Sequence, residues 1–165
     1  MKKTPRPPPS KPLDAASARE RALRLLARRE HGARELTAKL RQRGADADTA
    51  EAAVSRLAER GLQSDDRYAE TLARHRAGQG YGPLRIRAEL AQAGIDRGRI
   101  EQVMEDLQVD WAAQAAAIVE RRFAGAAEDR ETGLRAWRHL AGRGFSAGEI
   151  RAAVRGYDPE DPGGS

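Results

Sequence analysis

Apolar residues recur along the chain at intervals of three and four, the spacing of one face of an α-helix. Ile100, Val103, Met104 and Leu107 follow this rule, and the same stripe occurs within residues 50–57. A further stripe begins at Trp111 and continues to position 119. The pattern predicts an all-α protein.

The stripes belong to a unit that repeats every fifty residues. Leu40, Leu90 and Leu140 stand at equivalent positions, and a glycine follows each of them four residues later. Two residues after each glycine stands a residue that commonly serves as a helix N-cap: Asp46, Asp96 and Ser146 in the three copies. We interpret each glycine as the left-handed end of one helix, with the next helix starting after a two-residue gap. Self-similarity at a fixed period is typical of repeat architecture.

A third helix is predicted before each of these helix pairs. It begins at a capping box, Ser17 to Glu20, in the first copy and at Ser64 or Asp65 in the second. Pro83 is placed to open the helix that follows the glycine-rich residues 78–82.

The expected architecture is three tandem three-helix, helix-turn-helix-like repeats that form an elongated curved body. The repeats span residues 16–62, 63–109 and 110–157, between a disordered, basic, proline-rich tail at residues 1–15 and a flexible tail at residues 158–165. The side chains expected in the core include Leu36, Leu40, Ile86, Leu90, Val103, Met104 and Leu107.

Composition narrows the possible functions. Hydrophobic residues form 39% of the chain but aromatic residues only 4%, which argues against a β-sandwich core and against long base-stacking platforms. The chain has no cysteine, so a disulfide framework, a cysteine-based zinc site and a cysteine nucleophile are excluded. No apolar run approaches a membrane span, and the start lacks the apolar region of a secretory signal. We therefore expect a cytoplasmic location and no membrane partner.

No group of residues has the spacing of a catalytic or metal site. His31, His75 and His139 lack metal-type neighbours, and the glycine-rich residues 78–82 lack the Lys-Ser/Thr of a phosphate-binding loop. Asp65 and Asp66 are paired carboxylates, but a helix cap explains them equally well. We expect a protein that is not an enzyme and that uses no cofactor and no metal.

The charge is unevenly distributed. Lys and Arg exceed Asp and Glu by seven in residues 1–62 (15 against 8), whereas residues 63–108 and 109–165 each have a net charge of −1. Such an excess attracts phosphate backbones or an acidic protein groove. The alternative is a solvated face in an arginine-rich chain, since Arg outnumbers Lys 26 to 4. The first candidate patch comprises Arg21, Arg24, Arg28, Arg34, Lys39 and Arg43, with Arg21, Arg24 and Arg28 on one helical face.

A second candidate patch lies in the middle repeat. Arg85 and Arg87 follow Pro83, and Arg97 and Arg99 follow Asp96, so these cations occupy first turns where they oppose the helix dipole. Positive charge at two helix N-termini suits an anionic partner, although the cost of exposed arginines is small and tolerable. The complete second patch is Arg74, Arg76, Arg85, Arg87, Arg97 and Arg99.

The helix pairs joined at the repeated glycines resemble helix-turn-helix elements. A recognition helix in the major groove is therefore an alternative function, with the chain binding DNA directly. The apolar stripes explain the same residues as core without any DNA.

Three motifs, in order, resemble the RecX family. They are residues 25–40 followed by Gly44, residues 65–69, and residues 80–90 followed by Gly94 and Ile95. Together with the looser third repeat they cover residues 20 to 155, most of the chain. Gly32 departs from the family pattern, which often has Ser or another helix starter there, and this puts the first helix junction in doubt.

The resemblance implies a regulator of the RecA recombinase in recombination, DNA repair and the SOS response. Family members are thought to bind in the groove of the RecA–single-stranded-DNA filament, where they block filament extension, ATP hydrolysis and strand exchange. The expected partners are thus the RecA filament and the single-stranded DNA within it, with direct DNA contact left open. We expect the protein itself to be a monomer.

Overall fold

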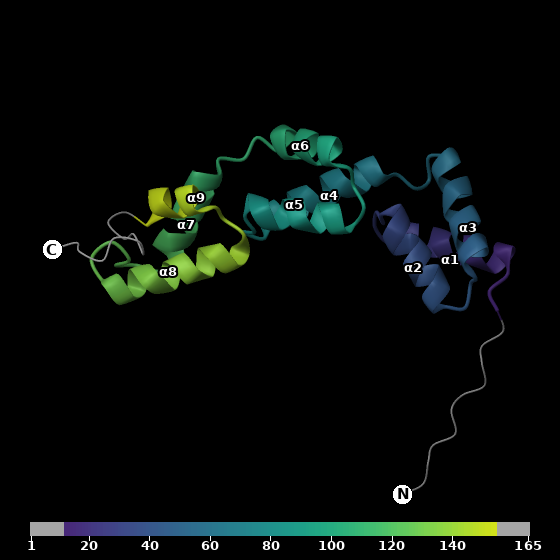
Figure 1. Ribbon diagram of the computed structural model, residues 1–165, viewed down its shortest axis with the longest axis horizontal. Helices are drawn as coiled ribbons and strands as arrows, with labels where there is room; N and C mark the ends of the chain where they lie inside the picture. The colour runs from purple at the N-terminus through teal and green to yellow at the C-terminus, as the bar shows by residue number, and fades with distance from the viewer. Residues whose placement is uncertain (1–11, 155–165) are drawn as a thin grey trace, which may run out of the picture. The chain divides into compact units, whose positions relative to one another are not determined.

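The computed structural model describes residues 12–154, which contain nine α-helices and no β-strand (Figure 1). The helices are α1 (Ala15–Leu26), α2 (Ala33–Gln42), α3 (Ala47–Glu59), α4 (Asp65–Gly78), α5 (Pro83–Gln92), α6 (Arg97–Asp106), α7 (Trp111–Arg122), α8 (Arg130–Arg143) and α9 (Ala147–Ala153). The prediction of an all-α protein built from three-helix repeats is confirmed. The predicted tails fall mainly outside the described residues, at positions 1–11 and from 155 onward.

The chain divides into two compact units, residues 1–69 and 70–165, and the boundary falls within α4. In the first unit α3 packs against both α1 and α2. Its core gathers Leu36, Leu40, Val54 and Leu57 with small alanines from α1 and α3. Alanine lets α1 approach closely, because it adds apolar contact with little bulk.

The second unit contains the remainder of α4 and the helices α5 to α9. Ile86 and Leu90 on α5 and Val103 and Met104 on α6 are buried there, as predicted. In the third repeat α9 packs against α7 and α8 around a core that includes Ile118, Leu140 and Ile150. Leu107 differs from the prediction: it is only half-buried, at the C-cap of α6.

The turn that recurs every fifty residues forms as predicted. Gly44, Gly94 and Gly144 have φ angles of 100°, 89° and 88°, the left-handed conformation that glycine adopts without a Cβ penalty. The next helix is capped in each copy by the side chain two residues later. In the third copy Ser146 and Glu149 form a complete capping box.

The start of α1 differs from the prediction. The N-cap is Asp14, whose carboxylate accepts from the Ser17 backbone N–H at 2.8 Å. Ser17 and Glu20 therefore lie inside the helix and do not form its capping box. An Asp cap supplies the same acceptor as a Ser cap.

The N-terminus of α2 is capped from a distant part of the chain. Its N-cap, Gly32, has no side chain, and the Ala33 N–H donates to Oδ1 of Asp65 at 2.7 Å. The same carboxylate oxygen accepts from Nε2 of Gln63 at 2.8 Å, while Ser64 caps α4 itself. The glycine at position 32 therefore does not disrupt the junction between the first two helices. A Cβ at this position would lie 3.2 Å from the Tyr68 ring, and the Asp65 carboxylate performs the capping that a side chain at position 32 would otherwise supply.

A buried imidazole lies beside this junction. His31 is 3% exposed, and its carbonyl accepts from the Gln63 side chain at 3.2 Å. Its Nδ1 lies 3.1 Å from Oε2 of Glu35. Burial lowers the pKa of His31, and the positive charges of Arg29 and Lys39 lower it further. The negative charge of Glu35 raises this pKa, but the net result lies below the usual value.

In the second unit, the start of α5 meets the end of α8 through main-chain atoms. The Gly82 N–H donates to the Arg143 carbonyl at 2.8 Å, and the Leu84 N–H donates to the Gly144 carbonyl at 3.0 Å. A Cβ at Gly82 would lie 2.4 Å from the Gly144 carbonyl and the Phe145 nitrogen. Each helix end supplies the partners that the other lacks, since the first N–H groups and last carbonyls have none within their own helix.

We predict that Gly82→Ala lowers the free energy of unfolding by about 1–3 kcal/mol, because the added methyl group meets backbone that cannot rotate away. Gly82 has a φ of −82°, so backbone strain does not contribute to this loss. The matched control is Gly142→Ala within α8, where a Cβ meets nothing within 4 Å. This control should gain about 0.5–1 kcal/mol. Urea titrations measure both, and equal stability of the two variants would contradict the close approach.

We predict that the protein loses stability as the pH falls from 7 to 5, partly through His31. Its folded-state pKa lies below the unfolded value of about 6.5, so its contribution is complete above that value and is lost at lower pH. His31→Gln should show a shallower fall of Tm over this range than the parent, and the exposed His75→Gln should follow the parent. A His31→Gln profile parallel to the parent would contradict the assignment.

Candidate partner-binding surface

The first arginine patch is only partly assembled in the structure. Arg21 and Arg24 lie on α1, but that helix ends at Leu26. Arg28 therefore occupies the turn after it, and the predicted helical face of three arginines is wrong. The chain leaves the helix in a turn at residues 27–28, and α2 begins at Ala33. Lys39 lies on α2, Arg43 is its C-cap, and Arg34 lies in its exposed first turn.

Carboxylates offset part of the first patch. Arg24 pairs with Glu20 one turn earlier on α1, with both side chains more than half exposed. Glu35 lies between Arg29 at 2.6 Å and Lys39 at 3.6 Å. Partial burial raises the pKa of Glu35, but the hydrogen bond from Arg29 and the neighbouring charges hold it below its usual range. Arg24 and Lys39 of the first patch therefore have neighbouring carboxylates that partly offset their charge.

The second patch is more strongly tied into the fold. Arg76 and Arg85 both donate to Glu89, at 2.7 and 3.0 Å, and Arg87 binds Glu101 at 3.0 Å. Burial raises the pKa of Glu89, yet the two arginine hydrogen bonds outweigh it and leave that pKa below its usual range. The Arg87 hydrogen bond likewise lowers the pKa of Glu101.

Arg97 and Arg99 have different environments although they share one helical turn. Arg99 reaches from α6 to Glu70 on α4 at 2.6 Å, and its side chain is 25% exposed. Arg97 is exposed. The two residues were predicted to act together as a contact surface, but the Arg99 side chain instead binds Glu70 within the protein.

The arginines at the start of α5 have a structural explanation. The positive end of α5 lies against the carbonyls that end α8, so the unfavourable interaction of Arg85 and Arg87 with the helix dipole is offset there. Glu89 and Glu101 add opposite charge. At the start of α6 the Asp96 carboxylate accepts from the Arg99 N–H at 3.0 Å. An anionic partner is therefore not required to explain these cations.

Three arginines surround the ring of Tyr81, between α4 and α5. The guanidinium carbons of Arg76, Arg85 and Arg143 lie 5.4, 5.5 and 4.7 Å from the ring centroid, within the range of cation–π interactions. These four residues are called the Tyr81 cluster below. Neither Tyr81 nor Arg143 belongs to the two patches predicted from the sequence. The fifty-residue spacing could have found Arg143, because it is the equivalent of Arg43.

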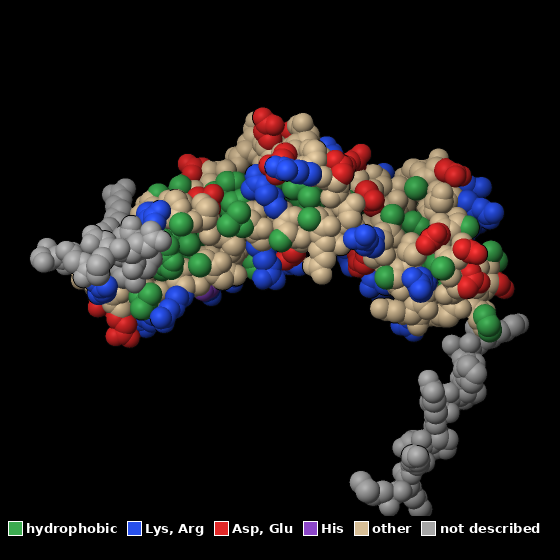
Figure 2. All heavy atoms as spheres, viewed as in Figure 1, with side chains coloured by type: hydrophobic (Ala, Val, Ile, Leu, Met, Phe, Trp, Pro, Cys, Tyr) green, Lys and Arg blue, Asp and Glu red, His purple; other side chains and the backbone are tan. Residues whose placement is uncertain are grey.

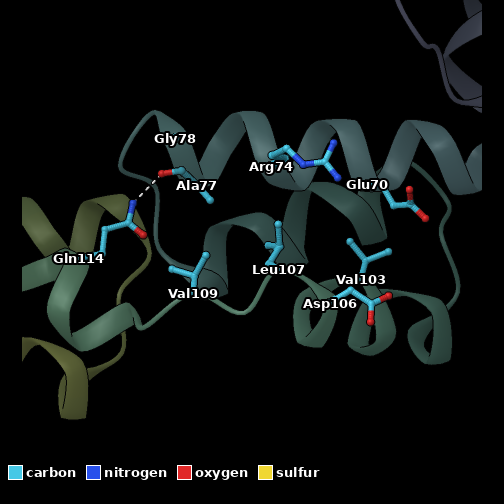
Figure 3. Close-up of a pocket in the computed structure, with 9 residues that line it drawn as sticks. All are labelled: Glu70, Arg74, Ala77, Gly78, Val103, Asp106, Leu107, Val109 and Gln114. Carbon is cyan, nitrogen blue, oxygen red and sulfur yellow. Dashed lines mark hydrogen bonds between the residues drawn. The ribbon is translucent and has the colours of Figure 1, made fainter.

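A groove of about 650 Å³ lies beside α4 and α6 (Figure 3). Ala77, Val103, Leu107 and Val109 give it apolar walls. Arg74, the remaining member of the second patch, lies on α4 along the groove with Glu70. Gln114 closes one end by donating to the Ala77 carbonyl at 2.6 Å. The half-buried position of Leu107 is explained by this groove.

Positive side chains are mixed with negative ones on the face drawn in Figure 2. Lys and Arg groups alternate there with Asp and Glu in both units, without a continuous basic stripe. Among residues 12–154, no three histidines or carboxylates come close enough to hold a metal ion. No helix in this described part is long and apolar enough to cross a membrane.

Comparisons with known families match two parts of this arrangement. The model of the first three-helix domain of RecX matches residues 18–57, and the model of the second three-helix domain matches residues 64–104. The first match contains α2 and most of α1 and α3, and the second contains α4, α5 and most of α6.

Full-length relatives extend the similarity over most of the chain. The chain is 48% identical over 149 residues to Regulatory protein RecX of Halorhodospira halophila, which covers 90% of this chain and 92% of that protein. It is 49% identical over 146 residues to Regulatory protein RecX of Pseudomonas entomophila, with 88% and 94% covered. The crystal structure of RecX from Lactobacillus salivarius shares the fold, with a TM-score of 0.71 at 23% identity over 86% of this chain and 94% of that one.

We predict that Arg99→Ala lowers the free energy of unfolding by about 1 kcal/mol. The substitution removes the ion pair between α6 and α4 and the packing of the aliphatic part of the arginine side chain. Arg97→Ala, two positions earlier in the same helix, should change it by less than about 0.5 kcal/mol. Chemical denaturation of both variants checks the difference. A larger loss for Arg97→Ala would show that the assignment of the two arginines is reversed.

Proposed function

This chain belongs to the RecX family, and from that premise we propose that it regulates the RecA recombinase, chiefly as an inhibitor. The proposed mechanism is occupancy. The protein lies in the groove of the RecA–single-stranded-DNA filament and obstructs the addition of protomers, ATP hydrolysis and strand exchange. The observation that carries the proposal is the identity of 48–49% to proteins named Regulatory protein RecX over nearly their whole length.

Two properties of the described residues support a function by binding. The helices form repeats, an architecture that commonly presents binding surfaces. The exposed arginines of both patches offer guanidinium groups suited to carboxylates and phosphates. We propose both patches as contact surfaces, with Arg99 excluded from direct contact because it serves the fold.

We propose that the protein acts without catalysis of its own, as a cytoplasmic monomer. The groove beside α4 and α6 carries one arginine and two carboxylates among apolar side chains. The carboxylates are already engaged: Glu70 binds Arg99, and Asp106 accepts from Gln102 at 3.0 Å. Inhibition of RecA would then follow from the stoichiometry of binding rather than from turnover.

We predict that the protein inhibits RecA-catalysed, single-stranded-DNA-dependent ATP hydrolysis at less than one copy per RecA protomer. The assay is a titration at two salt concentrations, with a parallel measurement of binding to the same DNA in the absence of RecA. Inhibition at concentrations that leave bare DNA uncovered supports filament binding. Absence of inhibition, with tight and steeply salt-dependent DNA binding, would instead favour direct DNA binding through helix-turn-helix-like units.

The test of the second patch uses Arg85→Gln with Arg87→Gln. Glutamine is chosen because glutamate at these positions would face Glu89 and Glu101 and destabilise the fold by repulsion. The double variant should raise the protein concentration needed for half inhibition by more than about tenfold. The control is Arg138→Gln, an exposed arginine of α8 outside both patches. Equal inhibition by the folded double variant and the control would remove this patch from the proposal.

A further inference from the structure

We propose that the Tyr81 cluster and the neighbouring Leu84 form a docking site for an acidic protein segment that carries an apolar side chain. The inference rests on the proposed function and assigns the segment to the RecA protomer. The carboxylates of the segment would bind Arg85 and Arg143, while its apolar side chain covers Leu84.

The cluster concentrates positive charge in a small volume. Each of its three guanidinium carbons lies within 5.5 Å of one ring centroid, so any two of them are less than 11 Å apart. Glu89 is the carboxylate that binds two of them, and its side chain is only 19% exposed. Three cations and one anion leave a surplus of two positive charges beside a half-buried aromatic ring.

Donor groups remain available on the side of the cluster that faces solvent. Arg85 is half exposed and uses only Nε, toward Glu89, among the contacts in residues 12–154. Arg143 uses one terminal nitrogen, which donates to the Gln79 carbonyl at 2.9 Å. The remaining N–H groups form planar forks that match the two oxygens of a carboxylate.

Leu84 adds an exposed apolar side chain one residue before Arg85. It is 53% exposed, one of two large hydrophobic side chains with high exposure in the described part of the chain. It precedes Arg85 in the first turn of α5, where its N–H is already bound to the Gly144 carbonyl. Tyrosine and arginine are enriched at protein–protein hot spots, and the exposed leucine adds apolar area that a partner can cover.

The site is held in place before any partner arrives. Arg76 and Arg85 come from α4 and α5, whereas Arg143 comes from the end of α8. The main-chain hydrogen bonds from Gly82 and Leu84 to Arg143 and Gly144 fix these helix ends against each other. Arg76 is further held by Gln79, whose side-chain oxygen accepts from it at 2.9 Å. A preorganised site loses little conformational entropy on binding.

The charge around the cluster favours a protein over a nucleic acid. Residues 70–154 contain 13 arginines and 12 carboxylates, so the second unit is almost neutral outside this point. A nucleic acid needs a basic track for successive phosphates, whereas a short acidic segment needs only a local group of donors. The phosphates of a nucleic acid would also make no favourable contact with the apolar side chain of Leu84.

The experiment measures binding of the full-length chain to RecA without DNA, and inhibition of the RecA ATPase with DNA. Leu84→Ser and Arg85→Gln should each weaken binding to RecA more than tenfold and raise the half-inhibitory concentration in parallel. Arg85→Lys should recover little, because ammonium keeps the charge but loses the fork. Leu62→Ser and Arg138→Gln are matched controls, since Leu62 is 45% exposed and both residues lie outside the cluster.

Binding to a fluorescein-labelled oligo-dT without RecA separates the outcomes. Unchanged affinity and salt slope for DNA, with lost RecA binding, supports the docking site. A weaker affinity with a salt slope reduced by about 0.7 per lost contact would reassign the cluster to phosphates and overturn the proposal. If folded Leu84→Ser and Arg85→Gln bind RecA as tightly as the parent does, the docking site is overturned and the proposed function stands. If the parent itself neither binds nor inhibits RecA, both the docking site and the proposed function are overturned.

Discussion

The meeting of two helix ends organises the second unit. The N–H groups of Gly82 and Leu84 and the carbonyls of Arg143 and Gly144 satisfy one another, and two glycines allow the backbones to approach. Three other features depend on this contact. It offsets the positive end of the α5 dipole, which Arg85 and Arg87 would otherwise oppose. It also brings Arg143 to the ring of Tyr81, and it satisfies the Leu84 N–H while the Leu84 side chain stays exposed.

The first unit solves the same problem with a side chain. Like α5, α2 begins at a glycine N-cap that offers no side-chain acceptor, and its first N–H is satisfied by Asp65 from the start of α4. Gln63 holds that carboxylate and the His31 carbonyl together, and Arg67 binds Glu30 at 2.7 Å nearby. Both junctions therefore join a helix start to residues at least thirty positions away, so packing between elements, rather than local capping, fixes where these two helices begin.

The sequence was sufficient for features that depend on neighbouring residues. The left-handed glycines at positions 44, 94 and 144, the caps that follow them and the start of α5 at Pro83 are determined within a few residues, and all were predicted. Features that depend on distant contacts were not. Neither the role of Asp65 in capping α2 nor the position of Arg143 over Tyr81 has a local signal, and Leu107 follows the apolar stripe yet lines a groove. Among the candidate site residues, the sequence could not show that Arg99 binds Glu70 or that α1 ends before Arg28, because both depend on the folded arrangement.

The main-chain character of the contact between α5 and α8 separates two roles within one small region. Glycine at two positions sets the frame, because the bonds there involve no side-chain atom of either partner. The arginines, the tyrosine and the leucine that project from this frame take no part in these main-chain hydrogen bonds. Their chemistry is therefore free to diverge between related proteins, one side chain at a time, so that the choice of partner can evolve while the backbone beneath it stays the same.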